Sequence, residues 1–132
     1  MTTADTATAD MLRAYYAAWC TTDPDRIAPF FTPDATFEDL AFNAVFEGHD
    51  GVRTFAQMTF DAAPDFAITP TSIIVTGTHA AASWTMRGTF TNDLAGLPAT
   101  GRPFEIRAAS IIELRDGLIH RMTDYWNPAG LM

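Results

Sequence analysis

Residues 104–127, with the sequence FEIRAASIIELRDGLIHRMTDYWN, decide the fold that the rest of the chain supports. In the first half of this stretch apolar and charged residues alternate. The apolar face consists of Phe104, Ile106, Ala108, Ile112 and Leu114, with Ser110 as its only polar member. Alternation with a period of two is typical of a β-strand that buries one face. Arg115-Asp116-Gly117 predicts the turn into a second strand.

The length of that turn decides which way Asp124 points. A two-residue Asp-Gly turn would pair Leu114 with Ile119 and would place Asp124 on the charged face. A three-residue loop, with Gly117 in the left-handed conformation as a bulge, would pair Leu114 with Leu118. We favour the longer loop because it gathers the apolar residues of the second strand on the buried face. The predicted opposite pairs are then Ser110 with Met122, Ala108 with Asp124, and Ile106 with Trp126.

Composition predicts one domain, residues 1–132, and argues against several kinds of partner. With 132 residues, 48% of them hydrophobic, the chain can bury about two-thirds of its unfolded surface. Its net charge of −8 argues against nucleic acids and anionic membranes as partners. No apolar run could span a bilayer, and residues 1–6, which we expect to be frayed, start no signal peptide. We therefore expect a cytoplasmic protein.

Three segments of the first half predict helices, over residues 6–21, 23–31 and 50–63. Asp23-Pro24 is a typical helix start, and Asp50 is the expected cap of the third helix. The inner stripes of the first and third helices are Leu12, Tyr15, Tyr16 and Trp19, and Val52, Phe55, Ala56 and Thr59.

Further strands are predicted at residues 36–40, 66–76 and 79–91, and residues 92–102 form a long connection. Helices first and long strands afterwards indicate the α+β class. We expect three N-terminal helices packed on a curved antiparallel sheet, giving a cone whose open end forms a ligand pocket.

Four parts of the chain resemble the nuclear transport factor 2-like superfamily, and in particular its SnoaL-like polyketide cyclases and ketosteroid isomerases. They are Tyr-Ala-Ala-Trp at 16–19, FFTPDATFED at 30–39, FEGHDGV at 46–52, and the closing RDGLI at 115–119 with Asp124-Tyr125-Trp126. The resemblance covers nearly the whole chain. It implies a homodimer formed through the outer face of the sheet, which Ile111 and Ile119 on the charged face favour. Because this superfamily hosts many chemistries, the resemblance specifies the fold better than the reaction.

The resemblance implies three catalytic residues. Asp39 matches the proton-shuttling carboxylate of the isomerases, and Tyr15 matches their oxyanion tyrosine. Asp124 matches the acid/base aspartate of the cyclases. The chain departs from both patterns at Ser110, where the isomerases have a protonated acid and the cyclases a histidine. A serine hydroxyl is a weaker donor than either.

Physical chemistry gives the two aspartates a functional and a structural interpretation. On the pocket face, Asp124 would have a raised pKa suited to proton transfer. The alternative is an exposed carboxylate, or one paired with Arg107 or Arg121. Asp39 shares a face with Phe37 near the mouth of the cone, but it could instead be satisfied by loop amides. Two carboxylates in one pocket would push their pKa values apart, so that one is a base and the other an acid.

We therefore expect a cofactor-independent cyclase or isomerase that removes a proton next to a carbonyl group of an apolar polyketide- or steroid-like molecule. The predicted substrate-binding residues are Ser110, Tyr16, Trp19, Trp84, Met86, Ala108, Met122 and Trp126. Alternatives are a non-catalytic module that binds a small ligand, a structural domain with a filled cone, and an epoxide hydrolase using Asp39, Arg87 and Asp124. No two histidines have metal-ligand spacing, so we expect no metal site.

Overall fold

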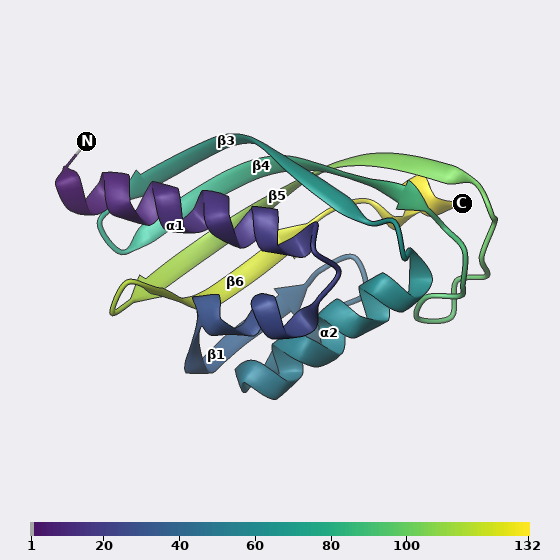
Figure 1. The fold of residues 1–132 in the computed structure, drawn as a ribbon, viewed down its shortest axis with the longest axis horizontal. Coiled ribbons are helices and arrows are strands. Elements are labelled where there is room, and N and C mark those ends of the chain that lie inside the picture. Colours follow the sequence, from purple (N-terminus) through teal and green to yellow (C-terminus); the bar gives the residue numbers. More distant parts are fainter. Residues whose placement is uncertain (1) are drawn as a thin grey trace.

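A six-stranded sheet forms one layer of the molecule, and the helices form the other (Figure 1). The computed structural model describes residues 2–132. The strands are β1 (Phe31–Asp39), β2 (Ala44–Glu47), β3 (Ala67–Thr76), β4 (His79–Thr89), β5 (Pro103–Arg115) and β6 (Leu118–Tyr125), in the spatial order β2-β1-β6-β5-β4-β3. The pair β1 and β6 is parallel, and all other pairs are antiparallel. The sheet is therefore mixed, whereas the sequence predicted an antiparallel one. The α+β class is confirmed.

The helices lie on the inner, concave side of the sheet (Figure 1). The two long helices are α1 (Thr3–Trp19) and α2 (Gly48–Ala62). Between them, where a short second helix was predicted, the chain forms two consecutive 3-10 turns, η1 (Pro24–Arg26) and η2 (Ala28–Phe30). A further 3-10 turn, η3 (Pro128–Leu131), ends the chain. The predicted inner stripe of α1 is buried because Leu12, Tyr15, Tyr16 and Trp19 all face the sheet.

Both long helices begin earlier than predicted. The side chain of Thr2 accepts a hydrogen bond from the Asp5 backbone N–H at 3.0 Å, and the Asp5 carboxylate accepts one from the Thr2 backbone N–H, so α1 starts at Thr3. Residues 3–6, expected to be frayed, are helical for this reason, while Met1 lies outside the described residues. At α2 the chain turns through Gly48, whose φ is +67°, so the predicted cap Asp50 lies inside the first turn.

The turn between β5 and β6 is the two-residue Asp116-Gly117 turn, and the predicted three-residue loop is wrong. Both residues have positive φ, +55° and +76°, as a type I′ hairpin requires. Leu114 pairs with Ile119, so Ile119 is buried and does not belong to the outer face. The register then shifts, because Glu113 pairs with Arg121 and His120 is the extra residue of a bulge.

The bulge restores the inward orientation of the rest of β6. Asp124 consequently lies opposite Ser110, and Met122 opposite Ile112. The predicted pairs of Ser110 with Met122 and of Ala108 with Asp124 are therefore wrong by two residues. A shift of two residues preserves the face on which a side chain lies, so Asp124 is on the inner face, as predicted.

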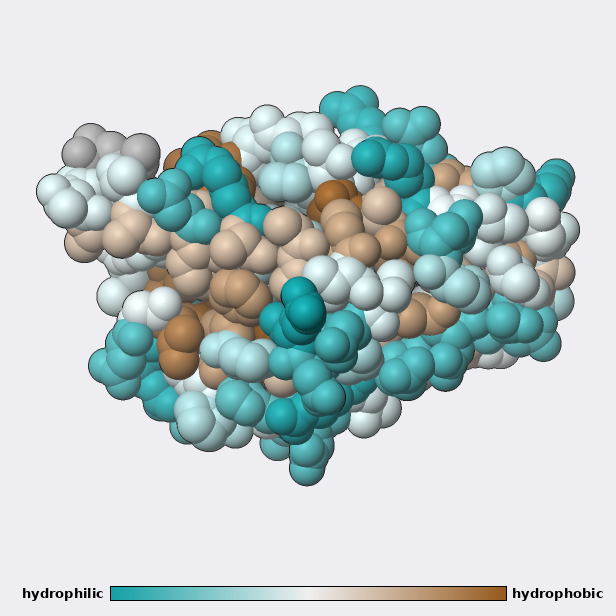
Figure 2. All heavy atoms as spheres, in the orientation of Figure 1, coloured by the Kyte–Doolittle hydropathy of each residue, from teal (hydrophilic) through white to brown (hydrophobic). Residues whose placement is uncertain are grey.

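The outer surface is mixed in character. Figure 2 shows a pale apolar band along α1, where Ala7, Ala14 and Ala17 are exposed, and a mainly hydrophilic surface over α2. Within the described residues, no helix combines the length and the apolar character needed to cross a bilayer.

Candidate functional site

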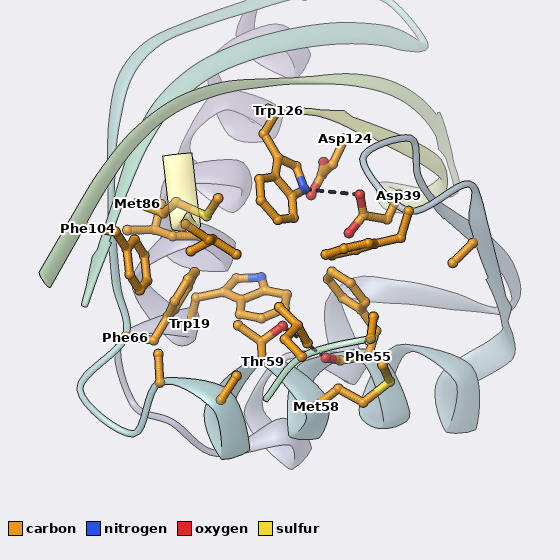
Figure 3. A pocket seen from close by; sticks show the side chains of 18 of the residues that line it. Trp19, Asp39, Phe55, Met58, Thr59, Phe66, Met86, Phe104, Asp124 and Trp126 are labelled. Atoms are coloured by element: carbon orange, nitrogen blue, oxygen red, sulfur yellow. Dashed lines mark hydrogen bonds between the residues drawn. The ribbon is translucent and has the colours of Figure 1, made fainter. Parts of the chain in front are cut away.

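A cavity of about 90 Å³ lies between the concave face of the sheet and the helices. Its wall is almost entirely apolar and aromatic. Asp39 and Asp124 approach it from the sheet side, and Phe55, Met58 and Thr59 of α2 form the opposite wall (Figure 3). Among the described residues that line it, there is no lysine, arginine or histidine. The two carboxyl groups therefore have no cationic partner in the cavity.

Asp39 is the last residue of β1 and is 0% exposed. Its Oδ1 accepts hydrogen bonds from Trp126 Nε1 and from the Ala41 backbone, each at 3.0 Å (Figure 3). Its Oδ2 is buried and has no hydrogen-bond partner among the described residues. Burial raises the pKa of Asp39 to about 6, although the bonds from Ala41 and Trp126 oppose the shift.

Asp124 lies directly beside Asp39 on the parallel strand β6, and it is 6% exposed. On its other side is Ser110 of β5, whose Oγ lies 2.6 Å from Asp124 Oδ1. Burial raises the pKa of Asp124 to about 8; the Ser110 bond lowers it, and the negative charge of Asp39 raises it further. Burial therefore favours the protonated form of both neighbouring carboxyl groups, and more strongly that of Asp124.

Two adjacent tyrosines of α1 differ in the use of their hydroxyl groups. Tyr15 donates a hydrogen bond to Met122 Sδ at 3.3 Å. The hydroxyl of Tyr16 is buried and has no hydrogen-bond partner among the described residues, although Tyr16 lines the same cavity. Burial raises the pKa of both phenols, so both remain protonated donors at neutral pH. In the structure, therefore, Met122 occupies the hydroxyl of the predicted residue Tyr15, whereas the hydroxyl of Tyr16 has no hydrogen-bond partner among the described residues.

Comparison with known proteins places this architecture in a family. Residues 12–122 match the model of the SnoaL-like domain, which is most of the chain. The chain belongs to the SnoaL-like family. This confirms the resemblance expected from the sequence.

Relatives of this SnoaL-like chain include a cyclase. It is 30% identical over 105 residues to cyclase aurE from Calcarisporium arbuscula, covering 79% of this chain and 74% of that protein. A candidate SnoaL-like polyketide cyclase from Jannaschia sp. CCS1 has the same fold, with a TM-score of 0.87 at 15% identity, covering 98% of this chain and 91% of that one. TsrD from Streptomyces laurentii has a TM-score of 0.84 at 25% identity, with coverage of 96% and 92%. The protein is thus a distant homologue of polyketide cyclases.

Most predicted site residues of this SnoaL-like domain meet at the cavity. Those that line it are Asp39, Asp124, Tyr15, Tyr16, Trp19, Trp84, Met86 and Trp126. Three predicted substrate-binding residues do not line it: Ser110, Ala108 and Met122. Ser110 and Met122 are buried in the wall, where they bond to Asp124 and Tyr15. They are therefore supports of the site and not contact surfaces.

The sequence interpretation missed several lining residues, including Phe42, Phe46, Phe66, Phe90, Leu94 and Phe104. Some come from loops, which carry no periodic signal. The alternation of β5 does mark Phe104 as facing inward. Arg87 is exposed on the outer face, where its guanidinium donates to Thr69 Oγ1 at 2.9 Å, so the epoxide-hydrolase arrangement is not formed.

Proposed function

We propose that the protein is a cofactor-independent acid/base enzyme, a cyclase or an isomerase. It removes a proton next to a carbonyl group of an apolar polyketide- or steroid-like small molecule. The observation that supports this most is the pairing of Asp39 with Asp124 on adjacent strands, inside a cavity without a cation. Two carboxyl groups whose pKa values are driven apart, to about 6 and about 8, suit a base and an acid that work at neutral pH.

In this mechanism Asp39 is the base. It is mostly ionised near pH 7, and its unpartnered Oδ2 can take the proton from the substrate carbon. The electron pair of the broken C–H bond forms the C=C bond of an enolate, and the π pair of the carbonyl group moves to its oxygen. Protonated Asp124 donates to this oxygen, or to the alkoxide that forms when the enolate attacks a second carbonyl group. In a cyclisation, proton transfer from Asp39 to Asp124 then restores the pair. In an isomerisation, Asp39 instead returns its proton to another carbon of the enolate, and Asp124 keeps its own proton.

The remaining wall supports a neutral, apolar substrate. A ligand carboxylate or phosphate would meet two acids and no cation, which is unfavourable. The free hydroxyl of Tyr16 is a further donor for the enolate oxygen. The cavity is only about 90 Å³. A larger substrate therefore places its reacting end near the aspartates, and aromatic side chains move aside to accommodate the remainder of the molecule.

Deuterium exchange tests the proposed proton abstraction. The protein is incubated in D₂O with a panel of apolar 1,3-diketones and cyclic enones, and exchange at the acidic carbon is followed by mass spectrometry. We expect catalysed exchange that Asp39→Asn lowers by about two to four orders of magnitude. Glu38→Gln is the matched control, because Glu38 precedes Asp39 and faces the other side of the sheet, where Thr123 Oγ1 is 3.4 Å from its carboxylate.

The rival interpretation, a non-catalytic binding module, predicts a different result. It requires ligands of the panel to bind, for example by quenching the fluorescence of the cavity tryptophans, without catalysed exchange. Exchange that is equal in the native protein and in Asp39→Asn would also contradict the proposal.

A further inference from the structure

A chain of two hydrogen bonds lies in the wall behind Asp124. Trp84 Nε1 donates to Ser110 Oγ at 2.9 Å, and Ser110 Oγ lies 2.6 Å from Asp124 Oδ1. The three residues come from the neighbouring strands β4, β5 and β6. Ser110 is 0% exposed, so bulk water does not compete for its hydroxyl group. The acid/base proposal above does not require these two hydrogen bonds. The role of the two bonds follows from which group donates in each.

The direction of both bonds is fixed by the chemistry of the donors. An indole N–H can only donate, so Ser110 must accept from Trp84. The single hydrogen of the Ser110 hydroxyl remains available for another acceptor. Asp124 Oδ1 lies within hydrogen-bond distance of this hydroxyl, at 2.6 Å, and the Tyr16 hydroxyl also lies near it. Of the two, the carboxyl oxygen is the stronger acceptor. Since a buried hydroxyl hydrogen without an acceptor is costly, Ser110 donates to Asp124 Oδ1.

This direction decides which oxygen of Asp124 can hold a proton. Oδ1 already receives the hydrogen of Ser110, so a proton on Oδ1 would oppose that hydrogen. The proton of the neutral form therefore resides on Oδ2. Asp124 lines the cavity while its Oδ1 is turned into the wall, so Oδ2 is the oxygen left for a ligand and for neighbouring Asp39.

We propose that Trp84 and Ser110 are positioning residues that hold the Asp124 proton on Oδ2, the oxygen left for a ligand and for neighbouring Asp39. The inference rests on the proposed acid/base function for its meaning. The position of the Asp124 proton, however, is a property of the protein without ligand. It can therefore be tested without a substrate.

The test is a carboxyl titration by NMR of protein labelled with ¹³C at the aspartate side-chain carboxyl carbon. In Ser110→Ala the ionised form of Asp124 loses its hydrogen bond, so we expect its pKa to rise by about one to two units above the native value. Asp39 is the internal reference. It titrates at about 6, where Asp124 is protonated in both proteins, so its pKa should not move.

Additional variants separate positioning from packing. Ser110→Cys keeps the shape with a weaker donor and should raise the Asp124 pKa, whereas Ser110→Thr keeps the hydroxyl and should leave it near the native value. Trp84→Phe keeps a ring but removes the N–H, and a smaller rise is expected because polarisation of the Ser110 hydroxyl is lost. If the wall merely loosens, water enters and the pKa values of both aspartates fall toward their ordinary range.

Three results would overturn the inference. They are an unchanged Asp124 pKa in both Ser110→Ala and Ser110→Cys, a fall of both aspartate pKa values in these variants, or no response to Trp84→Phe. Either of the first two results would show that Ser110 has no positioning role, and the third would show the same for Trp84. None depends on turnover, so loss of the proposed enzymatic activity and loss of this positioning role would be observed in separate experiments.

Discussion

Replacing Asp124 with asparagine should stabilise the protein at alkaline pH and leave it nearly unchanged at acidic pH. In the folded state burial holds the pKa of Asp124 at about 8, whereas the unfolded chain ionises near 3.8. Between these values the folded state holds a proton that the unfolded state has released. Stability therefore falls as pH rises from about 4 to about 8. Asparagine does not ionise, so it removes this dependence.

The size of the effect follows from the width of that pH window. A window of about four units at about 1.36 kcal/mol per unit gives an upper limit of roughly 5 kcal/mol above pH 8. Asparagine retains an oxygen that can accept from Ser110, so the wall keeps its hydrogen bond. Relaxation of the buried site around the charge reduces the measured gain below this limit.

The difference in unfolding free energy is measured by urea unfolding of the native protein and of Asp124→Asn, at equal protein concentration, between pH 4 and pH 9. We expect the difference in unfolding free energy to be small at pH 4, to grow through pH 6 and to level off above pH 8. Glu38→Gln, on the opposite face of the sheet, should give a nearly flat difference. A flat curve for Asp124→Asn, or one that is largest at pH 4, would refute the claim that burial controls this carboxyl group.

Other predictions address the reaction, the tyrosines and the assembly. The rate of proton abstraction should show a bell-shaped pH profile with limbs near 6 and 8, because Asp39 must be ionised and Asp124 protonated; a single limb would leave one of them without a role. Tyr16→Phe should weaken binding of 2-naphthol, an enol mimic, without lowering the melting temperature. Tyr15→Phe should lower the melting temperature without weakening this binding, because it loses the hydrogen bond to Met122. We propose that the outer sheet face forms a homodimer, so Ile111→Glu should give monomers by light scattering, and unchanged mass would contradict it.

The sequence predicts the inner face of each long strand well, because burial alternates along a strand whatever its partners. Asp124 shows both the strength and the weakness of this reasoning. Its inward orientation was inferred through a three-residue loop that does not exist. A two-residue turn followed by a bulge at His120 gives the same orientation, and a bulge has no local sequence signal.

The pairing of the two aspartates could not be predicted from local patterns. Asp39 and Asp124 meet because β1 lies parallel to β6, and the order of strands in a sheet is a non-local property. The choice between Tyr15 and Tyr16 is similar. Both lie on the buried stripe of α1, and only the position of Met122 Sδ decides which hydroxyl is occupied. Helical spacing cannot reveal that contact.

The parallel contact between β1 and β6 also sets the order in which the protein can become competent during synthesis. It joins Phe31–Asp39 to the strand that ends at Tyr125, so the paired carboxyl groups come from segments that are far apart in the sequence. Contacts of such large sequence separation form late, since much of the chain must be ordered first. A nascent chain still lacking β6 would hold Asp39 without Asp124, and truncation before residue 124 would remove this carboxyl group while α1 and α2 remain in the chain.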